Sequence, residues 1–218
     1  SNVDELKQRC AFLMHEVSYS ESHAALPSTR VQVIYLDRTD LNRADRWDDQ
    51  TTFTQALRVM QNDASNPLAR ERMVEARLAE ACTRKRRYVV DEVLEGLRGG
   101  GKVVVFTARR DETDAWGHAI RRALSQGDAQ LSKPTPVWVG HGGVSEADRV
   151  QMVEQYKLSD GPCVLIGTGQ AFGTAVDGMQ TTDLAIFAML PWKPGDFVQW
   201  KGRFDRLGGR ATLLKVIV

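Results

Sequence analysis

Four residues near the carboxyl end of this 218-residue chain have the types and spacing of a phosphate-binding group. Gln199, Gly202, Arg203 and Arg206 recur at intervals of three and four residues, so on a helix they would share one face. A guanidinium group is always charged and forks onto pairs of oxygen atoms, which suits it to charge on a transferring phosphoryl group. A surface helix with solvated arginines would show the same pattern. The four residues alone therefore leave both interpretations open.

Two apolar segments before this group predict buried strands, Cys163–Ile166 and Leu184–Ala188. The first segment is followed by a polar, glycine-rich loop, Gly167–Gly178. The second leads through a proline-containing turn to a helix that we expect from Asp196 to about Leu207, with Asp196 as its N-cap. Because the arginines follow a glycine-rich loop and two buried strands, phosphate binding is favoured over a solvated helix face.

Other apolar runs predict further strands at residues 31–36, 102–106, 137–139 and 211–218. Helical patterns separate the central strands; one of them opens with the capping box Ser145–Asp148, and another ends near Gly127. Strand and helix alternate four times. The sequence therefore predicts an α/β fold, a parallel sheet with helices on both faces, together with an N-terminal strand and a charged helical insertion at residues 41–97.

Ligands of open parallel sheets bind at the carboxyl ends of the strands. Three polar segments fall at these ends in the predicted fold, namely Thr107–Arg110, Gly140–Gly143 and the start of the loop at Gly167. We predict nucleic-acid contacts there from Thr107, Arg109, Arg110, His141, Gly142, Thr168 and Gly169. The hydroxyl group of Thr168 either donates to a phosphate or caps its own loop. His141 has no cysteine or carboxylate at metal-ligand spacing, so we expect no metal site.

The composition excludes several classes of protein. The chain is 42% hydrophobic and 26% charged with a net charge of +1, which is ordinary for a globular protein and gives no overall basic footprint. Its three cysteines have neither disulfide nor metal spacing, which suits a reducing compartment, and no apolar run approaches the length of a membrane span. The glycines of Gly99–Lys102 precede a strand instead of following one, which argues against a Walker A loop, and no Walker B run is present.

The order of these segments resembles the second motor lobe of superfamily 2 helicases and translocases. Gln199–Gly208 is similar to motif VI of that family, Gly167–Gly178 to motif V, and the end of the strand at Thr107 to motif IV. The segment Leu190–Pro194 resembles the one that the Snf-type branch places before motif VI. The resemblance covers at least residues 89–209, with Asp205 and Gly209 departing from the usual histidine and glutamine.

This resemblance implies an ATP-driven motor on double-stranded DNA. A first RecA-like lobe, absent here, would bind most of the ATP and Mg²⁺, and residues 1–40 would link it to this lobe, which occupies residues 98–218. Arg203 and Arg206 would act as arginine fingers, and Gly173, Asp177, Gln199 and Gly202 would contact the nucleotide. The fragment alone would be inactive. The expected location is the cytoplasm of a bacterium or of a virus-infected host, or the nucleus if the source is eukaryotic.

Two other functions are weighed against the motor. The first is a standalone nucleic-acid-binding or regulatory module that has kept the lobe without the ATPase. The second is a Rossmann-like enzyme that binds a nucleotide through the loop at Gly167–Gly178. The acidic strand end that such an enzyme needs about 20 residues further on is missing, so the sequence ranks it last.

Overall fold

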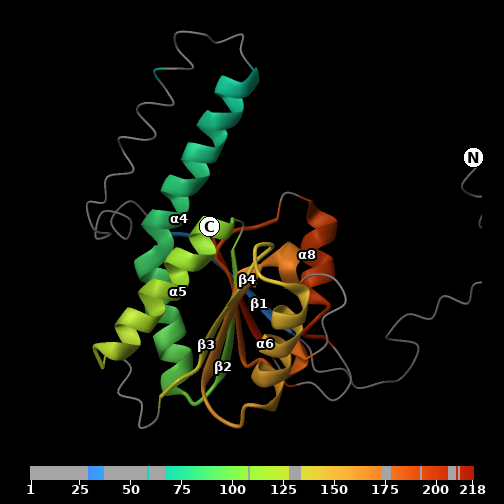
Figure 1. Cartoon of the computed structure of the whole chain (residues 1–218). Helices are drawn as coiled ribbons and strands as arrows, with labels where there is room; N and C mark the ends of the chain where they lie inside the picture. The colour runs from blue at the N-terminus through green and yellow to red at the C-terminus, as the bar shows by residue number, and fades with distance from the viewer. Residues whose placement is uncertain are drawn as a thin grey trace, which may run out of the picture.

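The computed structural model describes most of the region from residue 67 to the carboxyl end, together with β1 near the amino end (Figure 1). The described residues are 29–36, 58, 67–107, 109–127, 134–172, 178–191, 193–205, 210 and 212–218. Their strands are β1 (Arg30–Ile34), β2 (Lys102–Thr107), β3 (Val137–Gly140), β4 (Cys163–Thr168), β5 (Leu184–Phe187) and β6 (Leu213–Ile217). Their helices are α4 (Pro67–Arg98), α5 (Arg110–Ser125), α6 (Glu146–Leu158), α7 (Gly169–Phe172), the 3₁₀ turn η1 (Met179–Thr181) and α8 (Pro194–Lys201).

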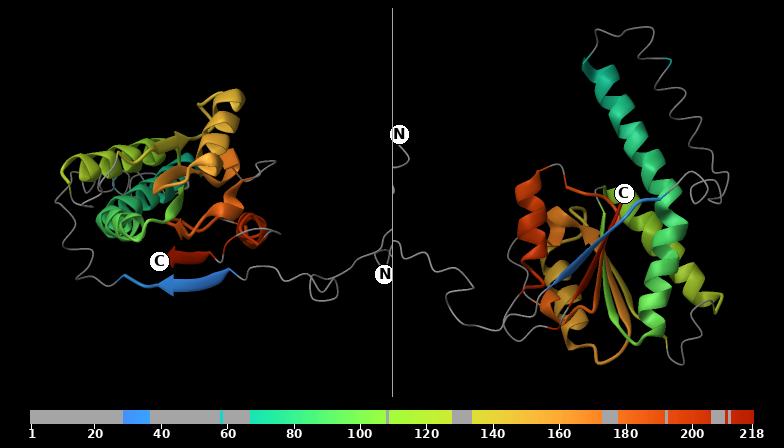
Figure 2. Two further views of the ribbon diagram at one scale, coloured as in Figure 1. Left: turned by 90° about the horizontal axis from the view of Figure 1, so that it is seen from below. Right: turned by 180° about the vertical axis from the view of Figure 1, so that it is seen from behind.

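The six described strands form one parallel sheet in the order β1-β6-β5-β2-β4-β3. Helices α4 and α5 cover one face of the sheet, and α6 and α8 cover the other (Figures 1 and 2). The parallel sheet with helices on both faces that the sequence predicts is therefore confirmed. The predicted N-terminal strand is part of the same sheet, where β1 pairs with β6.

Alternate residues of the central strands divide between two cores. On β2, Val103 and Val105 point toward α4 and α5, whereas Val104 and Phe106 point toward α6 and α8. β4 and β5 alternate in the same way, and their apolar side chains are buried on both faces. Continuous apolar runs are typical of such strands, which is why the sequence pattern identified them.

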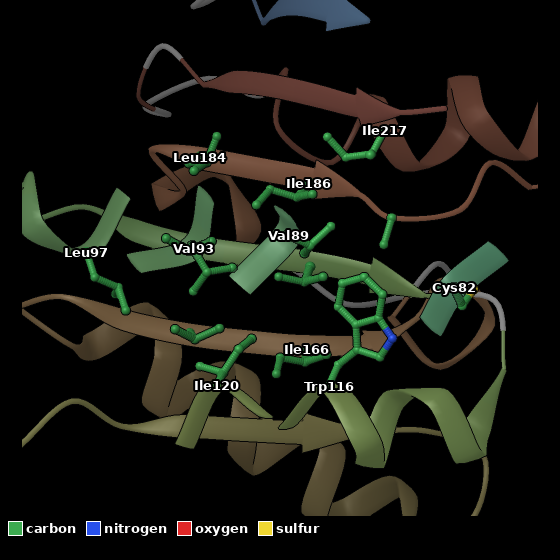
Figure 3. Packing of buried hydrophobic residues seen from close by; sticks show 14 residues of the cluster. Cys82, Val89, Val93, Leu97, Trp116, Ile120, Ile166, Leu184, Ile186 and Ile217 are labelled. Atoms are coloured by element: carbon green, nitrogen blue, oxygen red, sulfur yellow. The ribbon is translucent and has the colours of Figure 1, made fainter. Parts of the chain in front are cut away.

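The fully buried part of the core beneath α4 and α5 is mainly aliphatic, with Trp116 as its one large aromatic residue. Val89, Val93 and Leu97 of α4 lie over the middle of the sheet around β2, and Trp116 of α5 lies near β4 (Figure 3). The final turns of α4 are thus part of the core of the sheet. The beginning of α4 extends past the sheet, beyond the carboxyl ends of the strands (Figure 1).

The opposite core is rich in aromatic side chains. The ring centroids of Phe106 and Trp200 are 5.6 Å apart and those of Phe187 and Trp200 are 5.9 Å apart, both in stacked orientation. Phe204 meets the ring of Phe106 edge-on. This cluster fixes α8 against the ends of β2 and β5, so the turn that carries Arg203 directly after α8 has a defined position on the sheet.

The structure corrects several predicted boundaries. α8 begins at Pro194 and ends at Lys201, so Asp196 lies in its first turn and Lys193 is the N-cap. Proline at the first helical position has its φ angle preset for a helix, which explains the earlier start. Arg203 follows α8 in a turn and does not share a helix face with Gln199.

Other boundaries agree more closely with the sequence. Ser145 caps α6 as predicted, since its hydroxyl accepts from the Asp148 backbone N–H at 3.1 Å. Gly127, with φ of 79°, follows the end of α5 as expected. The cap of α5 is Arg109, so Asp111 and Thr113, near which the sequence placed the cap, lie inside the first turn.

Within the described residues, no helix is long and apolar enough to cross a membrane.

A buried hydroxyl pair on the α6 face gives a test of this packing. The hydroxyl groups of Tyr156 and Thr182 are 2.8 Å apart, and both side chains are fully buried. Tyr156→Phe leaves the Thr182 hydroxyl without this partner, and we expect a loss of about 1–2 kcal/mol in the free energy of unfolding. Adding Thr182→Val to Tyr156→Phe should cost less than the sum of the two single changes. Urea denaturation measures both effects; strictly additive losses would contradict the pairing.

Candidate functional site

The carboxyl ends of β2, β3 and β4 lie level in the sheet. Thr107 of β2 is in register with Thr168 of β4, and Gly140 of β3 is in register with Gly167 of β4. The register therefore brings together three segments that are separated in the sequence. Of the predicted nucleic-acid-contacting residues, Thr107 and Thr168 are neighbours on the face of the sheet that α4 and α5 cover, because they alternate with Val105 and Ile166.

Thr107 is buried, and its hydroxyl group is bound inside the protein. Its Oγ1 lies 2.6 Å from Oγ1 of Thr113, and Thr113 donates its own proton to the carbonyl oxygen of Arg109 at 2.6 Å. Because Thr113 has only one hydroxyl proton, Thr107 must be the donor in the pair. The Thr107 oxygen therefore faces the strand end as an acceptor, and the contact joins β2 to the first turn of α5.

Arg109 lies between two acidic side chains of α5. Its Nε and Nη2 atoms donate to the Asp111 carboxylate at 3.3 Å each, and Nε is 3.9 Å from Oε1 of Glu112. Desolvation pushes the pKa of Asp111 upward, but the hydrogen bonds and charge of Arg109 outweigh it, so this pKa lies below its usual value. A phosphate group approaching Arg109 would compete with the exposed Asp111 carboxylate.

Glu112 is a buried carboxyl group beside that arginine. Its side chain is 7% exposed, and neither oxygen has a nitrogen or oxygen hydrogen-bond partner among the described residues. Burial raises the pKa of Glu112, while the Cys82 thiol and Arg109 act in the opposite direction. Burial and the Glu112 carboxylate in turn raise the pKa of the Cys82 thiol, so Cys82 stays a neutral core residue.

His141 has both ring nitrogens bonded within the protein. The Gly143 backbone N–H donates to Nδ1 at 3.0 Å, which requires Nε2 to carry the proton that it donates to Asp114 Oδ1 at 3.3 Å. The imidazole ring thus joins the loop after β3 to α5. Its side chain is 8% exposed, so His141 orders this loop from inside, while Gly142 beside it is exposed.

Two arginines hold the same loop from the outside. Arg149 Nη1 donates to the Val144 carbonyl at 2.7 Å and to the His141 carbonyl at 3.4 Å. The Arg110 guanidinium lies over the backbone of Gly143, where a Cβ atom would come within 2.4 Å of its Cζ atom. The predicted residue Arg110 therefore sits beside the His141 loop, and glycine at position 143 permits this close approach.

The loop after β4 begins as a helical turn instead of the irregular loop that the sequence predicts. Gly167 and Thr168 end β4, and Gly169 begins α7. The Thr168 hydroxyl accepts from the Ala171 N–H at 3.3 Å, so it caps α7 in this structure. A Cβ atom on Gly169 would lie 1.9 Å from the Trp200 ring, so the backbone of this turn lies directly against α8.

The predicted nucleotide-contacting residues are described only in part. Gln199 and Gly202 are exposed, on α8 and at its C-cap, and Arg203 follows Gly202 in the turn. Gly173, Asp177 and Arg206 lie outside the described residues. A Cβ atom on Gly202 would meet only backbone oxygens, the nearest at 3.4 Å, and its φ of −61° suits any residue. The packing of the described residues therefore does not require glycine at position 202.

A cavity of about 640 Å³ opens at this edge of the sheet. Thr107, Arg109, Thr168 and Gly169 line it, so four of the residues predicted to contact nucleic acid share one space. The sequence prediction missed other lining residues, namely Glu71, Val74, Gln170, Met189, Leu190, Pro191, Lys193, Asp196 and Trp200. Of these, Lys193 could have been found from the sequence, because it is a cation in the polar segment between β5 and α8, as Arg109 is between β2 and α5.

Within the described part of the chain, no three metal-ligating side chains cluster.

A six-stranded parallel sheet in this order, with helices on both faces and polar segments at one edge, is a RecA-like α/β lobe. Residues 84–208 match the helicase conserved C-terminal domain, and the chain belongs to this family. The matched region contains the ends of β2, β3 and β4 as well as α8. It begins within α4, so Glu71 and Val74 lie outside it.

Solved structures agree on the fold. The C-terminal part of the Fun30 ATPase domain superposes with a TM-score of 0.60 at 9% identity, over 88% of this chain and 85% of that one. T4 UvsW gives a TM-score of 0.54 at 11% identity; 88% of this chain is covered, but only 32% of UvsW. The chain thus corresponds to about a third of UvsW. Comparison with curated protein sequences gives no match.

The buried carboxyl group of Glu112 generates a prediction about pH. Because the pKa of Glu112 is raised in the native state, the native state keeps this proton at pH values at which the unfolded state has lost it. The free energy of unfolding therefore falls as the pH rises above the usual carboxyl range. Each unit of the shift costs about 1.4 kcal/mol once the group is ionised. Glu112→Gln should therefore raise the free energy of unfolding at pH 8, and the gain should shrink toward pH 4.5.

Urea denaturation of both proteins at several pH values measures this difference. The charged neighbours are Arg109, Asp111 and Arg86, so Asp111→Asn is the matched control: its pKa is lowered, and the opposite pH trend is expected. A stability difference for Glu112→Gln that stays constant from pH 4.5 to pH 8 would contradict the assignment.

Proposed function

We propose that this chain is the second motor lobe of an ATP-dependent translocase that moves along double-stranded DNA. The first lobe, in a longer protein, would bind ATP and Mg²⁺, and this lobe would close over the nucleotide. Membership of the helicase C-terminal domain family supports the motor class. The Snf-type branch and the choice of DNA rest on the sequence resemblance at Leu190–Pro194 and Gln199–Gly208.

The contact between Gly169 and Trp200 carries this proposal. The backbone of the turn after β4 lies against the indole ring of α8, so close that no side chain fits at position 169. Phe106 and Phe187, near the ends of β2 and β5, stack on the same indole ring. A shift of α8 must therefore shift the strand-end loops, which supports coupling of nucleotide chemistry to movement on nucleic acid.

In this mechanism, Arg203 and Arg206 contact the phosphoryl group that is transferred, as fixed positive charges. Gly202 supports the assignment, because the fold of the described residues does not need a glycine there, whereas a close-fitting nucleotide would. Val198 and Gln199 on the exposed side of α8 would face the first lobe; Val198 is 67% exposed. Arg109, Arg110, the His141 loop and Thr168 would bind the phosphate backbone, while Thr107 orders the first turn of α5 beside them.

ATP turnover, measured with and without duplex DNA, tests the proposal. We expect no turnover from this chain alone and DNA-stimulated turnover from the longer protein. Arg203→Ala should lower that turnover roughly 10³-fold or more, the range of an arginine finger. Arg122→Ala, at an exposed arginine on α5, is the matched control and should leave turnover unchanged.

Each other outcome has a definite meaning. Unchanged turnover in Arg203→Ala would contradict the arginine-finger role. Stimulation by duplex RNA instead of duplex DNA would overturn the choice of substrate and retain the motor. Nucleic-acid binding without any turnover by the longer protein would favour the standalone binding module.

A further inference from the structure

The part of α4 that extends beyond the sheet shares a cavity with the strand ends. α4 has 32 residues and is about 48 Å long at 1.5 Å per residue, more than twice the roughly 20 Å of the six residues of β2. Its final turns pack on the sheet, and its beginning passes the carboxyl edge (Figure 1). Glu71 and Val74 of this extension line the 640 Å³ cavity together with Thr107 and Thr168.

The cavity is lined by charged, polar and apolar side chains. Arg109, Lys193 and the Thr168 hydroxyl group can bind phosphate, whereas Glu71 and Asp196 are acidic. Val74 and Leu190 add apolar surface and are 41% and 48% exposed. Cations bind nucleic acid chiefly through its phosphates, which are accessible in a duplex as well as in a single strand.

We propose that the extension of α4 at Glu71 and Val74 forms the second wall of the nucleic-acid groove. One strand of the duplex passes along it, with its phosphates at Arg109 and Lys193 and its sugars at Val74. The inference rests on the proposed function, and it adds contact residues that lie outside the matched family region. A cavity of this volume holds roughly one or two nucleotides, within the range for a single bound small molecule.

Glu71 sets the polarity of the groove. A carboxylate on the α4 wall repels phosphate, which directs the backbone of the strand toward Arg109 and Lys193. The acidic side chain thus lowers affinity at this wall while fixing the orientation of the strand. Reversing its charge turns the repulsion into one additional phosphate contact.

A pair of charge reversals on the same helix tests this wall. Glu71→Lys and Glu95→Lys change the net charge equally, both sites are exposed, and they lie about 36 Å apart along α4. Binding of a fluorescent DNA duplex to the 218-residue chain is measured by anisotropy at several salt concentrations. We expect Glu71→Lys to bind about eightfold more tightly at 0.1 M salt, with a slope of log affinity against log salt steeper by about 0.9. Glu95→Lys should match the unchanged chain.

Equal effects of Glu71→Lys and Glu95→Lys on binding would overturn the proposal that α4 forms a wall of the groove, because they would show only a general electrostatic attraction. Lys193→Ala separates this failure from failure of the groove itself: it should weaken binding and reduce the salt slope. If Lys193→Ala loses binding while Glu71→Lys behaves like Glu95→Lys, nucleic acid binds at this cavity but α4 does not contribute to the site. Unchanged binding in Lys193→Ala as well would reject nucleic-acid binding at this cavity.

Discussion

The level ends of β2 and β4 are the constraint on which the site depends. The parallel register places Thr107 beside Thr168, and the two cores hold this register because a slip of one residue would move Phe106 into the aliphatic core and Val105 into the aromatic core. The polar segments that follow the strands can therefore be displayed only at this edge. The hydrogen bonds of Thr107, Thr113 and His141 then order these segments from within.

The aromatic core beneath α8 extends this order to Arg203. Trp200 touches the backbone of Gly169 on one side and stacks with Phe106 and Phe187 on the other. Rigid packing of this kind transmits displacement, since a close-packed interior leaves no space to absorb it. The same contacts that stabilise the lobe thus join the proposed nucleotide side at Arg203 to the proposed nucleic-acid side at Thr168.

Much of this arrangement could be predicted from the sequence, for physical reasons. Strands buried on both faces appear as apolar runs, so the central strands and the polar residues at their ends were predictable. The boundary of α8 was not, because Pro194 at the first helical position outweighed the capping propensity of Asp196. The Thr168 cap is a local contact that the sequence offered as one of two interpretations, whereas the bond of His141 to Asp114 and the cavity position of Val74 depend on tertiary contacts that spacing does not encode.

The central claim is that the carboxyl edge of the sheet binds nucleic acid, and a residue-resolved titration tests it most directly. Amide resonances of the ¹⁵N-labelled chain would be followed by NMR as a short oligonucleotide is added. The account predicts shifts at Gly142, Gly143, Thr168 and Gly169, and none at Gly100 or Gly161, near the opposite ends of the strands. Shifts centred on Gly100 and Gly161, or none at the carboxyl edge at saturation, would contradict it.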